Sequence, residues 1–78
     1  MIIQYNDSMV DMDERYSSKD FTSIDFVDIA DGVNVYCSCF SHENPDTQVF
    51  RPDMTGVMFY NCNLNNCVIP PGNTVVGG

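Results

Sequence analysis

Four cysteines and one histidine are the side chains in this chain best suited to binding a metal. Cys37, Cys39 and His42 form a Cys-x-Cys-x-x-His pattern, and Cys62 and Cys67 are separated by four residues. Together they could supply the sulfur and nitrogen ligands of a tetrahedral zinc site. Neither cysteine pair has the two-residue gap typical of zinc knuckles. A metal-binding module using Cys37, Cys39, Cys62 and Cys67 is therefore an alternative, and the first expectation is no metal and no cofactor.

Nucleophilic catalysis would need one of these thiols beside a base that a third group orients. His42 is the only histidine, and Cys37 or Cys39 could pair with it. Nothing in the sequence separates the pKa of one carboxylate from that of another, and the five glycines are scattered outside any phosphate-binding motif. Because so short a chain forms little pocket, we expect a protein without enzymatic activity.

Acidic side chains dominate the sequence. Eleven Asp and Glu residues stand against three Lys and Arg residues, which gives a formal net charge of -8. Nucleic acids and anionic membranes are bound through basic side chains, so neither is an expected direct partner. A basic surface, such as that of a nucleic-acid-handling host protein, is the expected partner of the acidic first half of the chain. The candidate contact residues are Asp11, Asp13, Glu14, Asp20, Asp25, Asp28 and Asp31.

Residues 52–76 contain the clearest sequence pattern for the structure that positions these side chains. They repeat every five residues as PDMTG, VMFYN, CNLNN, CVIPP and GNTVV. The bulky third column contains Met54, Phe59, Leu64, Ile69 and Thr74. The smaller first column contains Pro52, Val57, Cys62, Cys67 and Gly72. Helices repeat apolar residues at about 3.6 and strands at 2, whereas short fixed periods are typical of solenoids. We expect both columns to face one interior.

These lines resemble the pentapeptide-repeat family, whose pattern is a small residue, Asn or Asp, Leu or Phe, and two polar positions. The line CNLNN, residues 62–66, matches it best. The resemblance implies a right-handed, four-sided β-helix with the small and bulky residues inside. Met58 and Val68 replace the Asn or Asp, and Pro70 and Pro71 interrupt a turn, so a looser β-roll is the other interpretation. The block CNLNNCVIPPGNTVVGG also resembles the ends of small phage and prophage proteins.

The first half of the chain resumes the same period. Residues 19–33 read KDFTS, IDFVD and IADGV, with Phe21 and Phe26 in the bulky column and Ile24 and Ile29 in the small one. Residues 34–40 alternate as a strand does. Residues 42–51 break the phase and are predicted to be a loop inserted at one corner.

The N-terminal segment, residues 1–18, is predicted to be a short strand over residues 2–5 and an amphipathic helix over residues 9–16 that caps one end. The predicted fold is thus mainly β: a short right-handed pentapeptide-like β-helix or β-roll of about two coils over residues 19–78. So small a core favours association. The uncharged last coil, with Val68, Val75 and Val76, is the expected self-association edge, and the resembled family commonly dimerises there. We expect a homodimer.

Three functions follow. The first is a small acidic phage-type inhibitor that presents a DNA-like surface to a host nucleic-acid-binding protein or defence complex. The resemblance supports it, because some family members imitate DNA, and acidic phage proteins block defence complexes such as CRISPR effectors. The alternatives are a structural virion component, such as a decoration or tail protein, and the metal-binding module. Without a signal peptide or membrane-spanning run, the expected location is the cytoplasm, that of the host cell if a phage encodes the chain.

Overall fold

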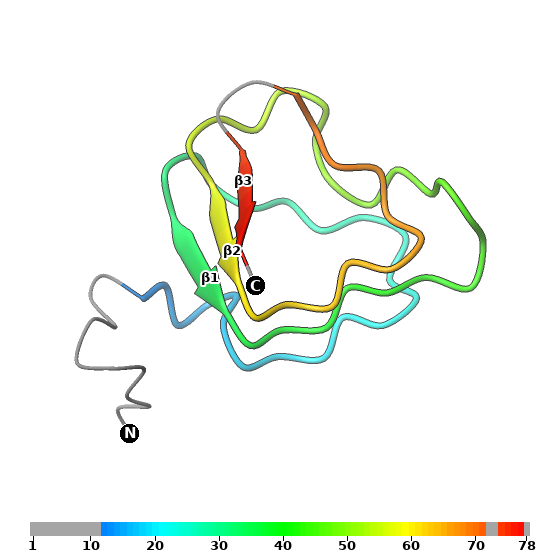
Figure 1. Ribbon diagram of the computed structural model, residues 1–78, viewed down its shortest axis with the longest axis horizontal. Coiled ribbons are helices and arrows are strands. Elements are labelled where there is room, and N and C mark those ends of the chain that lie inside the picture. Colours follow the sequence, from blue (N-terminus) through cyan, green and yellow to red (C-terminus); the bar gives the residue numbers. More distant parts are fainter. Residues whose placement is uncertain (1–11, 72–73, 78) are drawn as a thin grey trace.

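The computed structural model describes residues 12–71 and 74–77, and over them the fold is mainly β without a helix. Three short strands, β1 (Asn34–Tyr36), β2 (Met58–Tyr60) and β3 (Val75–Gly77), form a parallel sheet in the order β1-β2-β3. Figure 1 shows the chain circling away from each strand and returning to lay the next one beside it. Parallel neighbours require such long connections, since a tight hairpin can join only antiparallel strands.

Isolated parallel bridges extend this pairing around the rest of the path. They join Asp20 to Cys39, Cys39 to Asn63, and Val27 to Phe50. A further bridge joins Thr47 to Cys67. The segment from Cys39 to Thr47 is therefore four residues longer than the paired segment from Asn63 to Cys67. These extra residues lie within the stretch that the sequence assigns to an inserted loop, residues 42–51.

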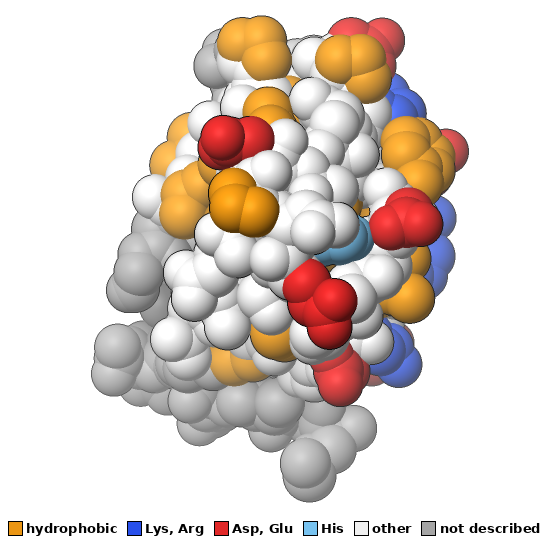
Figure 2. Space-filling model, turned by 90° about the vertical axis from the view of Figure 1, so that its right-hand side faces the viewer, with side chains coloured by type: hydrophobic (Ala, Val, Ile, Leu, Met, Phe, Trp, Pro, Cys, Tyr) orange, Lys and Arg blue, Asp and Glu red, His pale blue; other side chains and the backbone are white. Residues whose placement is uncertain are grey.

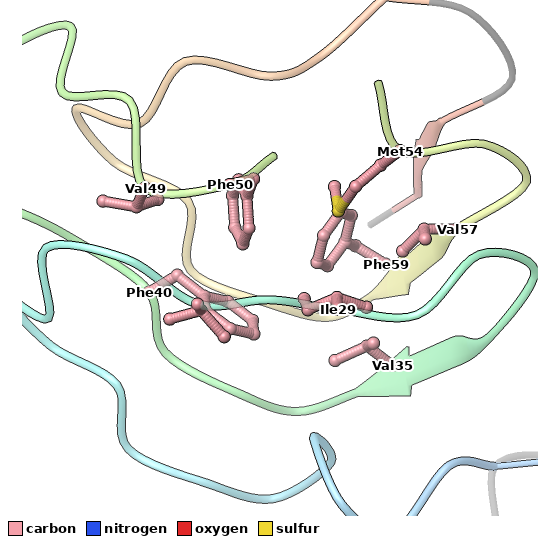
Figure 3. Close-up of a cluster of buried hydrophobic side chains, with 9 residues drawn as sticks. Ile29, Val35, Phe40, Val49, Phe50, Met54, Val57 and Phe59 are labelled. Carbon is pink, nitrogen blue, oxygen red and sulfur yellow. The ribbon is translucent and has the colours of Figure 1, made fainter. Parts of the chain in front are cut away.

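One apolar cluster fills the space inside these circuits (Figure 3). Its three central rings, Phe40, Phe50 and Phe59, have centroids 5.2 to 5.7 Å apart and are at most 1% exposed. Tilted and edge-on contacts of this kind are the preferred aromatic geometry. The remaining members are Val27, Ile29, Val35, Val49, Met54 and Val57.

The two predicted inward columns are confirmed over residues 54–67. Met54, Val57 and Phe59 are buried. Leu64 packs against the cluster, partly buried, as do the two cysteines of the small column. The prediction is wrong at Ile69, which is 36% exposed, and at Pro52, which lies at the surface. The five-residue period thus identifies buried positions only where the chain keeps an uninterrupted five-residue step.

In residues 19–33 the prediction is confirmed at Ile29, which is buried, and wrong at Ile24 and Phe26, which are 46% and 57% exposed. Val27, which is in neither predicted column, is buried. Ser23, in the fifth column, has a φ of 57° and is a left-handed corner. Asp28, five residues later, does not have a positive φ, so the five-residue step is interrupted after Ser23.

The predicted helix over residues 9–16 is also wrong for the part that the structure describes. Met12 forms a parallel bridge with Asn34, and the N–H of Asp13 donates to the Asn34 carbonyl at 2.9 Å. Residues 14–18 then form a turn. Met12 is thus extended and pairs with the strand, since its backbone hydrogen bonds come from the sheet. The predicted strand, residues 2–5, and the first residues of the helix, 9–11, lie outside the described residues.

Corner positions with a left-handed backbone also recur every five residues. Gly56, Asn61 and Asn66 have φ values of 70°, 54° and 66°. Gly and Asn tolerate this conformation better than other residues. Gly56 also lies against Gly32 of the preceding circuit, where a β-carbon on Gly56 would be 3.4 Å from the Gly32 α-carbon. The fifth column of the repeat therefore supplies the corners.

Candidate functional site

The predicted partner-binding carboxylates do not share one environment. Asp13 is tied to Arg15, whose Nη2 and Nε donate to it at 2.7 and 3.1 Å, and its side chain is only 14% exposed. The Arg15 guanidinium holds the pKa of Asp13 below its ordinary value. Asp13 thus stabilises the turn at residues 14–18, while Asp11 lies outside the described residues.

Arg51 gathers three further carboxylates. Its Nη2 donates to Asp31 at 2.8 Å and to the Ile29 carbonyl at 2.6 Å. Its Nε lies 2.7 Å from Asp28 Oδ1 as an ion pair, although the N–H does not point at that oxygen. A longer contact of 3.4 Å reaches Asp53. Because Arg51 lies on the circuit after Asp28 and Asp31, these contacts join two layers of the chain.

The same contacts determine the protonation of Asp31. The hydrogen bond from Arg51, followed by one from the Thr55 N–H, lowers the pKa of the Asp31 carboxyl. Asp28 and Asp31 are therefore already paired inside the molecule. Their charge is partly neutralised by Arg51, so they attract a basic partner less strongly than the sequence-based list of contact residues predicts.

Asp25 is the most exposed of the described carboxylates in ion pairs, with 94% of its side chain accessible. One of its oxygens lies 3.1 Å from Nε2 of His42, whose own side chain is buried. The N–H of Asn44 donates to Nδ1 at 3.2 Å, so Nδ1 is the acceptor and Nε2 carries the proton. The amide of Asn66 donates to the His42 carbonyl at 2.8 Å. His42 thereby links three successive circuits and fixes the base of the loop that follows it.

Several other carboxylates are exposed without an ion pair within the described residues. Glu43 and Asp46 lie on the loop that follows His42, and both are exposed. Asp20 accepts hydrogen bonds from the hydroxyl and N–H of Thr22, which lower its pKa. Glu14 is also exposed. Figure 2 shows acidic side chains around the histidine on one face of the molecule.

The basic side chains neutralise little of this surface. Arg15 and Arg51 are engaged in the internal ion pairs. Lys19 is exposed and has no ion pair within the described part of the chain. The carboxylates facing solvent therefore generate a largely negative field, which attracts cationic groups over about 8 Å at physiological salt.

The cysteines form two distinct environments. Cys62 and Cys67 donate to the carbonyls of Val35 and Phe40 at 3.5 and 2.9 Å, and burial raises the pKa of both thiols. Cys39 Sγ instead forms hydrogen bonds with the hydroxyl groups of Ser41 and Thr22, at 3.4 and 3.2 Å, and these lower the pKa of its thiol. None of the four cysteines forms a disulfide, and all four are partly buried.

The positions of the cysteines and of His42 do not support a metal site or a Cys–His nucleophile pair in the described residues. Within residues 12–71 and 74–77, no three Cys, His, Asp or Glu side chains come together as a metal site. Both ring nitrogens of His42 are engaged, one by Asp25 and the other by the Asn44 N–H. The predicted alternative of a metal-binding module on Cys37, Cys39, Cys62 and Cys67 thus has no ligand cluster in the described residues.

Of the predicted self-association residues, Val75 and Val76 lie in β3, whereas Val68 lies outside the sheet, where its N–H donates to the Thr47 carbonyl at 3.0 Å. Val75 and Val76 in β3 are 48% and 52% exposed, and Val68 is half-buried. β3 pairs with β2 on one side, and no described strand pairs with its other edge. No charged side chain follows Asp53 in the sequence. This edge is therefore neutral, whereas the face around His42 is acidic.

Comparison of the chain with protein-family profiles, curated proteins and solved structures finds no match. In the described part of the chain, no helix has the length and apolar character needed to cross a membrane. The geometry of the residues themselves is accordingly the basis for a functional assignment.

Proposed function

We propose that this chain is a non-enzymatic acidic interaction protein that binds a basic surface on a nucleic-acid-handling protein and competes with the nucleic acid for it. The observation that carries the proposal is the charge of the exposed surface. Two of the three basic side chains are held in internal ion pairs, while Asp25, Glu43 and Asp46 face solvent. Duplex DNA presents one negative charge per about 1.7 Å of axis, so a dense carboxylate surface can occupy a groove that is built for phosphates.

The proposed scaffold is a short right-handed β-helix of the pentapeptide-like kind. The parallel sheet, the parallel bridges and the left-handed corner residues at five-residue spacing support this proposal. Such a scaffold holds carboxylates on a stiff surface, because each circuit is fixed by the layers above and below. Its specific form would be a phage-encoded inhibitor of a host defence complex, such as a CRISPR effector, in the host cytoplasm.

A competition experiment tests the proposal. Fluorescent duplex DNA is bound to an oligoarginine peptide, and the protein is added at low ionic strength. We expect the protein to displace the DNA, and we expect the effect to weaken as salt rises from about 0.01 M to about 0.1 M, because the screening length falls from about 30 Å to about 10 Å. The triple variant Asp25→Asn, Glu43→Gln, Asp46→Asn should displace DNA less well.

The control removes the same number of negative charges from another part of the surface. The triple variant Glu14→Gln, Asp20→Asn, Asp53→Asn removes three exposed carboxylates that lie outside the loop following His42. This control variant should retain more displacement than the first triple variant. Displacement that is absent, or that does not respond to salt, would count against an electrostatic partner site.

A second candidate function rests on the neutral edge. Val75 and Val76 are half exposed on a strand that has one described neighbour, and unpaired edges favour pairing with another chain. A homodimer, or a structural virion assembly built on the same edge, is the corresponding proposal. Val76→Lys should make a self-associating chain monomeric in sedimentation, whereas an unchanged oligomeric state would contradict this role for the edge.

A further inference from the structure

Two apolar side chains lie beside the most exposed carboxylate of the proposed binding face. Phe26 is 57% and Ile24 46% exposed, and Asp25 stands between them in the sequence. Single exposed apolar residues are ordinary. Here, however, an aromatic ring and a branched side chain lie on one short segment, and both are outside the core. Their exposure follows from the backbone path of a hydrogen-bonded segment.

The backbone that carries them is held at three points. The N–H of Ser23 donates to the Ser41 carbonyl at 2.8 Å, and the N–H of Val27 donates to the Val49 carbonyl at 2.7 Å. Between these bonds, Asp25 contacts His42. A partner that covers Phe26 would therefore meet a segment that is already ordered, which reduces the entropy lost on binding.

The same contacts bring the acidic loop to this segment. Ser41 and His42 pair with residues 23–25, and Glu43 follows His42 directly, with Asp46 three residues further on. Figure 2 shows hydrophobic and acidic side chains on the face that carries the histidine. Apolar area and negative charge thus belong to one surface.

We infer that Phe26 and Ile24 form the apolar centre of the binding face, and that its partner is a basic segment carrying apolar side chains among its arginines. This inference rests on the proposed function and specifies the partner. Aromatic rings are enriched among residues that dominate binding energy. Asp25, Glu43 and Asp46 would select for positive charge around this centre.

Charge decides between this occupant and a second copy of the chain. Two copies meeting at this face would bring Asp25, Glu43 and Asp46 of each against the same carboxylates of the other, and like charges at close range oppose association. The neutral edge at β3 has no such repulsion. A basic segment is therefore the occupant that matches both the apolar and the charged side chains here.

Two synthetic peptides test the inference by titration calorimetry with the full chain. One is oligoarginine, and the other alternates arginine with leucine at the same number of arginines. At physiological salt, we expect the alternating peptide to bind about tenfold more tightly, which corresponds to about 1.4 kcal/mol. Phe26→Ala should abolish this preference, so that the folded variant binds the two peptides with equal affinity. Ile24→Ser should reduce the preference in the same direction, and Val76→Ala, another exposed apolar position, should retain it.

The outcomes separate the inference from the function on which it rests. If both peptides bind equally to the wild type, or if Phe26→Ala keeps the preference while circular dichroism shows it folded, the apolar centre is refuted and the acidic surface stands. If neither peptide binds at any salt concentration, the proposed function is refuted as well. Loss of oligoarginine binding in the folded Phe26→Ala variant would also overturn the inference, because the ring would then act on charge binding itself.

Discussion

Two phenylalanines in the same column of the five-residue pattern provide the sharpest comparison of stability. Phe59 is fully buried, with ring centroids 5.7 Å from Phe40 and 5.4 Å from Phe50. Phe26 is 57% exposed. Truncating a buried phenylalanine to alanine costs about 3–5 kcal/mol, because it removes buried area and leaves a cavity. A surface truncation such as Phe26→Ala should cost less than about 1 kcal/mol.

The size of the protein makes this difference easy to measure. A chain of 78 residues has a free energy of unfolding of about 4–12 kcal/mol at typical values per residue, so Phe59→Ala removes a large part of it. Its melting temperature should fall by at least about 12 °C. Urea unfolding followed by circular dichroism measures both variants against the wild type. Equal losses for Phe59→Ala and Phe26→Ala would refute the burial pattern described here, since the period alone treats the two rings alike.

Three further predictions concern charge, thiol reactivity and the corners. Asp31→Asn should lower the free energy of unfolding at neutral pH, because it removes the carboxylate that accepts the hydrogen bond from Arg51. The pKa of Asp31 in the folded chain is lowered from 3.8, so the stabilisation is present above pH 3.8 and the difference from wild type should vanish as the pH falls through the lowered pKa. Urea titrations from neutral to acidic pH measure it, and a difference independent of pH would contradict the pairing. Iodoacetamide should alkylate Cys39 before Cys67 at neutral pH, because hydrogen bonds lower the pKa of the Cys39 thiol and burial raises that of the Cys67 thiol. Peptide mass spectrometry gives the order of alkylation, and the reverse order would contradict these two environments. Gly56→Ala should lower the free energy of unfolding by about 1–2 kcal/mol, because the φ of Gly56 is 70°, and Gly56→Asn should lower it less. Equal falls in melting temperature for the two variants would argue against a left-handed corner.

The sequence predicts the interior well where side-chain size repeats without interruption. Met54, Phe59 and Leu64 all lie against the core, and each stands two residues before a left-handed corner. The same reasoning fails at Ile24 and Phe26, because the corner that the period places at Asp28 is missing and the spacing of apolar residues contains no information on it. Asn61 and Asn66, in the fifth column, are a signal for the corners that reasoning from the bulky and small columns alone misses.

The ion pairs could not be predicted from local sequence. Arg51 reaches Asp28 and Asp31 only because one circuit of the chain brings it above them. His42 meets Asp25 for the same reason, although the two are 17 residues apart. The sequence therefore identifies the acidic character of the surface, whereas the assignment of each carboxylate to an internal pair or to solvent requires the stacking of the circuits.

Chemical-shift mapping by NMR with an oligoarginine peptide tests the central claim most directly, since it locates the basic partner on the surface of the folded chain. The account predicts that the perturbed amides cluster in residues 23–28 and 41–47, where Asp25, Glu43 and Asp46 lie, and that raised salt reduces the shifts. Perturbations centred instead on residues 54–71, or spread evenly over the chain, would contradict it.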